Sequence, residues 1–222
     1  MKLSCRSVII AVVLMMFTSS VCMADGISAY SVPPDGAKSY KWIVDSTTTS
    51  TTNRGSSYSL FYVGEKEKKN GETDSCSISV GGSIQVGGTF EVNKNKVAKS
   101  FGLTIGASVE VSASKTSAPL AKGEYIKAYY RLNWKQWTVK QGKHCYVTRY
   151  SFDSNGNPTG IKLVDEGVVA RATGYLYRPI MPQIKLEYHK GSSARAMSVP
   201  YKTEEYVWNG KEYVLSDIKL HG

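Results

Sequence analysis

The sequence is poor in the residues on which most enzyme active sites depend, with three His and four Cys among 222 residues. It lacks the Gly-x-Ser-x-Gly nucleophile motif, the His-Glu-x-x-His metal motif and a Gly-rich phosphate-binding loop. His144 stands beside Cys145, but neighbours in sequence are not by that fact a catalytic pair. We therefore predict a protein that is not an enzyme, with no catalytic residues and no cofactor.

Metal-binding patterns are missing as well. The histidines have no zinc-site spacing. The stretch Asp153-x-Asn155-x-Asn157 resembles the start of a calcium loop, but Pro158 occupies the place of the expected glycine and the twelfth position is not Glu. This pattern predicts a polar turn between two strands, and we expect no metal.

Long apolar runs are limited to the amino-terminal region. The run from Val8 to Phe17 follows the basic residues Lys2 and Arg6, and Cys22-Met23-Ala24 comes after it. The run is too short to cross a bilayer as a helix. Its flanks indicate a cleaved secretory signal over residues 1–24, which predicts a secreted protein with a single all-β domain over 25–222.

Removal of that signal would leave two cysteines, Cys76 and Cys145. In an exported protein, a disulfide between them is favoured over two free thiols. It would close a loop of about 70 residues, which stabilises a fold by roughly 4 kcal/mol in the chain-entropy model. The alternative, in which one or both thiols are free, remains open at this point.

Acidic residues are outnumbered: 28 Lys and Arg face 18 Asp and Glu, for a net charge of +10. A basic surface attracts anionic lipid, acidic polysaccharide and nucleic acid. The basic residues are scattered along the chain, which argues against a dedicated nucleic-acid site. We expect an anionic membrane surface or an extracellular polymer as the partner, and no specific nucleic acid.

The clearest positive feature is a pair of stretches within residues 77–114 in which apolar and polar residues alternate. Period two is typical of β-strands, because successive side chains point to opposite faces. The stretches predict one long amphipathic hairpin whose polar connection contains Lys94, Lys96 and Lys99. The apolar faces are Ile78, Val80, Ile84, Val86, Phe90 and Val92 in the first arm, and Phe101, Leu103, Ile105, Val109 and Val111 in the second.

Two interpretations of this hairpin remain open. Its apolar face can cover the core of a β-sandwich. It can also face lipid, since each arm has the 9 to 11 residues that a transmembrane β-strand needs. The three lysines count against insertion, because charges are costly to move through hydrocarbon.

The remainder of the sequence is rich in strand-like segments and aromatic residues, and it contains no amphipathic helix longer than a turn or two. We predict an all-β fold, an elongated antiparallel sandwich with the long hairpin. Trp134 and Trp137, close to Lys135 and Lys140, are the candidates for a surface contact patch. The alternative is that these rings pack between strands, as aromatic residues often do.

Four features of the sequence occur together: the signal-like start, the Ser/Thr run from Ser46 to Thr52, the alternating hairpin, and the Pro-x-x-x-Gly turn from Pro119 to Gly123. This combination resembles the aerolysin-type β-pore-forming proteins, especially the epsilon-toxin and mosquitocidal-toxin group. The resemblance implies a non-enzymatic protein that is secreted in soluble form, assembles into a homo-oligomer and unfolds its hairpin into a shared pore. The lysines of the connection depart from that family, in which the same region tends to be apolar.

The function predicted from the sequence is therefore that of a secreted β protein that acts at membranes, by pore formation through its hairpin. The alternative is a secreted β-sandwich that binds an extracellular polymer or protein through its basic, tyrosine-rich surface.

Overall fold

The computed structural model describes residues 33–66, 69–191 and 199–221, so the predicted signal over 1–24 lies outside the described residues. The predicted all-β class is confirmed, since the described residues form nine strands and only one short helix. The elements are β1 (Lys38–Thr52), β2 (Ser59–Val63), β3 (Ser75–Ser83), β4 (Gln85–Gly88), α1 (Lys94–Ser100), β5 (Ser108–Thr116), β6 (Glu124–Phe152), β7 (Pro158–Lys190), β8 (Lys202–Trp208) and β9 (Tyr213–Leu220).

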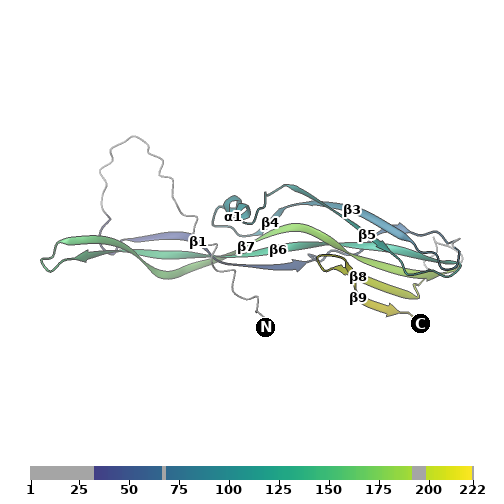
Figure 1. Ribbon diagram of the computed structural model, residues 1–222. Coiled ribbons are helices and arrows are strands. Elements are labelled where there is room, and N and C mark those ends of the chain that lie inside the picture. The colour runs from purple at the N-terminus through teal and green to yellow at the C-terminus, as the bar shows by residue number, and fades with distance from the viewer. Residues whose placement is uncertain (1–32, 67–68, 192–198, 222) are drawn as a thin grey trace, which may run out of the picture. The chain divides into compact units, whose positions relative to one another are not determined.

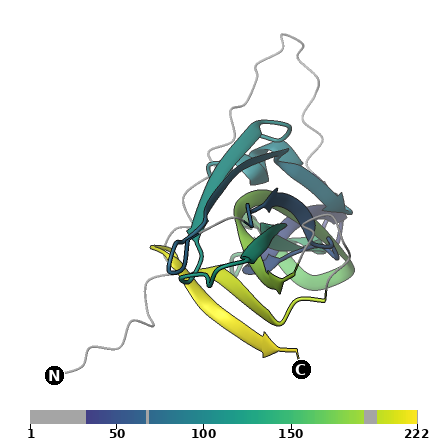
Figure 2. The same ribbon diagram turned by 90° about the vertical axis from the view of Figure 1, so that its right-hand side faces the viewer.

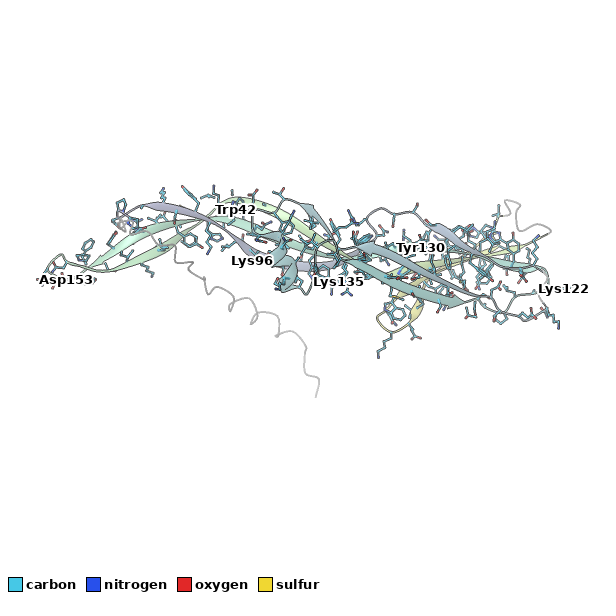
Figure 3. All side chains as sticks on the ribbon, turned by 90° about the horizontal axis from the view of Figure 1, so that it is seen from above. Trp42, Lys96, Lys122, Tyr130, Lys135 and Asp153 are labelled. Carbon is cyan, nitrogen blue, oxygen red and sulfur yellow. The ribbon has the colours of Figure 1, made fainter. Side chains whose placement is uncertain are left out.

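The unit from Asp35 to Gly222 is built on a large antiparallel sheet with the order β1-β6-β7-β8-β9. Strand β2 also pairs with β6, and β4 pairs with β7. The two central strands contain 29 and 33 residues, which correspond to lengths of roughly 95 and 110 Å. Figure 3 shows Asp153 at one end of this ribbon and Lys122 at the other.

The turn between β6 and β7 has the polar character that the sequence predicts. The Asp153 carboxylate accepts hydrogen bonds from the backbone N–H groups of Asn155 and Asn157, at 2.9 and 2.8 Å. These bonds lower the pKa of Asp153. The Asp-x-Asn-x-Asn pattern is thus explained by a turn in which the first carboxylate accepts hydrogen bonds from the backbone of that turn, and it needs no metal ion.

A second layer consists of β3 and β5, which form a separate two-stranded antiparallel sheet (Figures 1 and 2). The core between this layer and the large sheet has two apolar clusters. One contains Cys76, Ala113, Leu120, Ile126, Ala128, Ile184, Leu186, Tyr188 and Tyr206. The other contains Ile84, Ala98, Leu103, Trp137 and Leu176.

The predicted hairpin is present at its base but not along its whole length. Strands β3 and β5 pair in register from Ser75 with Thr116 to Ser83 with Ser108. Beyond this point the first arm continues into β4, which joins the large sheet. The prediction that the second arm is a strand from Phe101 onward is wrong, because β5 begins only at Ser108.

Local interactions explain this difference. The side chain of Asn93 accepts hydrogen bonds from the N–H groups of Asn95 and Lys96, both at 3.1 Å, and so caps the start of α1. Gly102 and Gly106, with φ angles of 69° and 82°, then adopt left-handed conformations that interrupt an extended strand. The predicted polar connection is therefore a capped helix followed by two turns.

The structure also corrects the predicted disulfide, because Cys76 and Cys145 are both buried free cysteines. Cys76 packs in the same cluster as Ile126, and Cys145 lies further along β6, opposite Tyr40 of β1. Ile126 and Cys145 are separated by about 19 residues of strand, or roughly 60 Å. A disulfide needs Cα atoms within about 7 Å of each other, so these two cysteines cannot pair in this fold.

Candidate functional site

We call residues 75–116, which comprise β3, β4, α1 and β5, the hairpin segment. Its two-stranded part has one polar and one apolar face. On the polar face, Ser79 lies opposite Ser112 with their hydroxyl oxygens 3.1 Å apart, and both residues are exposed. Ser79 also donates to the carboxylate of Glu110. The solvent-facing side of the segment is thus a row of small hydroxyl side chains.

The apolar face points toward the large sheet. Of the eleven residues predicted to face a membrane, none is exposed in this structure: Val80, Ile84 and Leu103 are buried and the others are half-buried. Ile84 and Leu103 pack with Leu176 of β7. The segment therefore has the two-faced character that a membrane-inserting hairpin requires, while its apolar side is covered by its own protein.

The predicted surface patch at Trp134 and Trp137 is wrong, because both side chains are only 8% exposed. Trp137 packs in the second cluster, with its ring centroid 6.0 Å from that of Phe101. Trp134 lies beneath Gly82, where an added Cβ would come within 3.3 Å of the Trp134 ring. Both indole rings belong to the surface of the large sheet against which the hairpin segment packs.

Gln141 of β6 holds the distal part of the hairpin segment against the sheet. Its side chain is 1% exposed, and its Oε1 accepts hydrogen bonds from the N–H groups of Glu91 and Val92, at 2.9 and 3.0 Å. Its Nε2 donates to the carbonyl oxygen of Thr89 at 2.9 Å. One buried amide thus satisfies three backbone groups of residues that belong to no strand.

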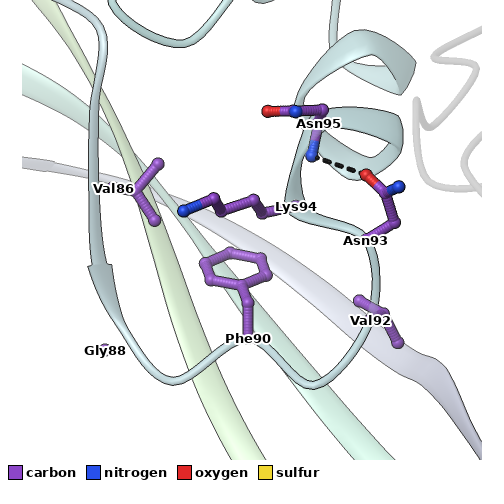
Figure 4. A pocket seen from close by; sticks show the side chains of 7 residues that line it. All are labelled: Val86, Gly88, Phe90, Val92, Asn93, Lys94 and Asn95. Carbon is purple, nitrogen blue, oxygen red and sulfur yellow. Dashed lines mark hydrogen bonds between the residues drawn. The ribbon is translucent and has the colours of Figure 1, made fainter.

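Phe90 fits onto the large sheet because residue 174 of β7 is glycine. A Cβ added at Gly174 would lie 2.2 Å from the Phe90 ring, well inside contact distance. Figure 4 shows Phe90 below α1, with the Lys94 side chain extending toward Val86. These side chains border a pocket of about 430 Å³, which is lined by Val86, Gly88, Phe90, Val92, Asn93, Lys94 and Asn95.

The lysines of the predicted basic tip lie on α1 and are all exposed. Lys96 is labelled on the surface in Figure 3. The helix has one buried residue, Ala98, which packs in the second cluster. The charged side of α1 therefore faces solvent while its other side lies against the protein.

Arg54 makes a further contact with the segment. Its guanidinium donates a hydrogen bond to the side chain of Gln85 on β4 and lies 4.2 Å from the ring centroid of Tyr177. The same guanidinium is 5.3 Å from the ring of Trp134. Arg54 thus connects the end of β1 with the β4 strand by a hydrogen bond and by cation–π contacts.

The base of the hairpin segment is attached differently from its distal part. Just before β3, the N–H of buried Asp74 donates to the hydroxyl of Ser117 at 2.9 Å, and Tyr62 donates to the Asp74 carboxylate at 3.0 Å. Burial, together with the hydrogen bond to Asp74, raises the pKa of Tyr62 to about 12. At the end of β5, the N–H of Ala118 donates to the hydroxyl of Tyr188 at 3.2 Å. These bonds fix both ends of the segment to the large sheet.

Gln141 and Arg54 are not among the site residues that the sequence predicts. Gln141 carried a usable signal, because it stands two and four residues after the apolar Val139 and Trp137 and so shares their face of β6. A polar residue at an inward position has to find a partner. Arg54 carried no such signal, since it lies in a turn between β1 and β2.

Within the part of the chain that the structure describes, no helix is both long and apolar enough to cross a membrane. Among the same residues, no cluster of three or more His, Cys, Asp and Glu side chains is arranged to bind a metal ion.

No family model and no curated relative matches this sequence. The solved structures that are similar to the chain include two toxin structures. One is the Cry23Aa1 and Cry37Aa1 binary protein complex, with 10% identity over 82% of this chain and 90% of that chain and a TM-score of 0.26. The other is parasporin-2, described as a Bacillus thuringiensis toxin that recognizes cancer cells, with 11% identity over 69% and 75% of the two chains and a TM-score of 0.20. At these TM-scores the likeness carries no conclusion about function.

Proposed function

We propose that this protein is secreted and acts at membranes without catalysis, by releasing the hairpin segment from the large sheet and inserting its apolar face into lipid. One observation carries the proposal. The apolar residues of the segment form one face that rests on the large sheet, while the segment shares only the four-residue strand β4 with that sheet. The segment can therefore leave without breaking the order β1-β6-β7-β8-β9.

The chemistry of the two faces supports insertion. After release, residues 75–92 and 101–116 can extend into arms of at least the 9 to 11 residues that cross a bilayer. The apolar faces would then contact lipid, and the serine and threonine side chains would face water. The attachment of both ends near Asp74 and Ala118 keeps the arms tied to the protein during this change.

Several copies are needed for such an insertion. A single inserted hairpin has two strand edges whose backbone N–H and C=O groups have no partner in hydrocarbon, and each unsatisfied group costs several kcal/mol. Pairing with hairpins of other copies removes these edges, so we include homo-oligomerisation in the proposal. The exposed lysines of α1 would bring the segment to an anionic lipid surface first.

The experiment locks the segment in place with an engineered disulfide. Gln85 of β4 lies directly opposite Tyr177 of β7, so the variant with Gln85→Cys and Tyr177→Cys can join the two strands. The matched control joins β3 to β5 through Ser79→Cys and Ser112→Cys, which also lie opposite each other. The control links the arms of the hairpin and leaves the segment free to move as a unit.

Dye release from liposomes is measured for both variants, oxidised and reduced, with neutral and anionic lipid. We expect the oxidised β4–β7 variant to release no dye and to recover on reduction, while the control releases dye in both states. Release by the oxidised β4–β7 variant at the wild-type rate would contradict the proposal. Absence of release by the wild type, with salt-sensitive retention on an anionic polymer, would support the alternative function as a binding module.

A further inference from the structure

Strand β1 is an edge strand of the large sheet. It pairs with β6 from Lys38 to Thr52, and in the described part of the chain no other strand pairs with it. The backbone groups on its outer side therefore form a free edge, which is a template for pairing with another strand.

The two halves of this edge are different. The first half contains Lys38 and Lys41, and Asp45 stands at an irregularity between Val44 and Ser46 in the pairing with β6. Charges and bulges of this kind protect a strand edge from unwanted pairing. The second half, Ser46–Thr52, consists of seven Ser and Thr residues in uninterrupted register with β6, without a charge, a proline or a glycine.

This second half is exposed on both faces, since only Thr52 among its seven residues is half-buried. Threonine favours strand geometry, and opposed Thr and Ser side chains on neighbouring strands stabilise pairing by hydrogen bonds. The stretch thus offers roughly 23 Å of strand edge, with side chains that suit pairing with a further strand.

We propose that the Ser46–Thr52 edge pairs in antiparallel orientation with the same stretch of a second copy, which gives a two-fold symmetric dimer. A stretch in which every side chain is a small hydroxyl is complementary to itself, and antiparallel pairing of identical strands closes the assembly at two copies. The chain has a net charge of +10, which disfavours contacts that bring like charges together. The Ser46–Thr52 stretch has no charged residue, so pairing there avoids this repulsion.

The register follows from the symmetry. With Thr49 on the two-fold axis, Thr47 lies opposite the partner's Thr51. Asp45 then lies level with the partner's Asn53, just beyond each end of the Ser46–Thr52 pairing. The hairpin segment takes no part in this contact, and the dimer does not depend on the proposed membrane function.

Cysteine cross-linking in solution, without lipid, tests this register. We expect Thr49→Cys to cross-link with its own copy, and Thr47→Cys or Thr51→Cys alone to cross-link poorly. A mixture of the Thr47→Cys and Thr51→Cys proteins should cross-link efficiently. The wild-type chain is the control, because Cys76 and Cys145 are both buried. Equal cross-linking at all three positions, or none at any, would overturn the proposed pairing.

A second measurement uses sedimentation over a range from low micromolar to millimolar protein. We expect the wild type to dimerise and Thr49→Lys to remain a monomer with an unchanged circular dichroism spectrum, because the new charges would meet at the axis. Ser151→Lys adds the same charge at an exposed site far along β6 and should still dimerise. A wild type that is monomeric throughout, or a Thr49→Lys dimer as tight as the wild type, would refute the proposal.

Discussion

His144 of β6 and Asp165 of β7 are joined by a contact of 2.6 Å between Nδ1 and Oδ2. The other ring nitrogen of His144 lies 3.0 Å from Oδ1 of Asp45 on β1. Gly142 leaves room for the Asp45 carboxylate, since an added Cβ would come within 2.6 Å of Oδ2. The His144 imidazole thus connects β1, β6 and β7. At this place β6 pairs irregularly with both β1 and β7.

This contact predicts a pH dependence of stability. Both nitrogens can donate only when the ring is protonated, and the hydrogen bonds to Asp45 and then Asp165 raise the pKa of His144. A pKa that is higher in the folded state than in the unfolded state stabilises the fold fully below about pH 6.5. That contribution is lost as the pH rises through the raised folded value.

Denaturant unfolding of the wild type and His144→Gln, measured from pH 5 to 9 and analysed by linear extrapolation to zero denaturant, checks this. The difference in free energy of unfolding should be constant at the acidic end and shrink toward the alkaline end. A difference that does not vary with pH would show that the ring is not charged in the fold.

Gln141→Leu should loosen the distal part of the hairpin segment. The substitution leaves the N–H groups of Glu91 and Val92 and the carbonyl of Thr89 without their partner. Loss of a buried partner costs about 1–3 kcal/mol. We expect faster hydrogen exchange at residues 89–92 and faster dye release. Gln136→Leu on the same strand is the control, because that amide bonds to Thr138 and not to the segment.

Gly174→Ala should displace Phe90 and destabilise the fold. The added methyl group would lie 2.2 Å from the Phe90 ring, and overpacking of this kind costs about 1–3 kcal/mol. The melting temperature should fall, and a second substitution, Phe90→Ala, should recover part of the loss in the Gly174→Ala background. Gly160→Ala, which has open space around the new methyl group, should be close to neutral. Additive losses in the double variant would contradict the contact.

Thiol titration should find Cys76 and Cys145 free. Without reductant, both should react once the protein is unfolded in denaturant. Burial raises the pKa of the Cys76 thiol to about 11, and the thiolate is the reactive form, so Cys76 should react slowly in the folded protein. A protein with no titratable thiol after unfolding would restore the disulfide that the sequence predicts.

Much of the hairpin segment could be read from alternation alone. The serines of β3 and β5 are outside and the valines are inside, as period two requires, because strand pleating is a local property of the backbone. The same rule failed from Phe101 to Ala107, where the Asn93 cap and two left-handed glycines break the strand. In that region the apolar residues of the alternating pattern lie on the inner side of turns and not on one face of a strand.

What the sequence by itself determined is the all-β class, the two-faced hairpin and the polar turn at Asp153, since each follows from neighbouring residues. The tertiary structure decided what covers the apolar face. It placed Trp134 and Trp137 under the hairpin segment, Gln141 against residues 89–92, and Cys76 of β3 beside Ile126, far from Cys145 on β6. These contacts depend on the register between strands distant in sequence, and periodicity within one strand contains no information about that register.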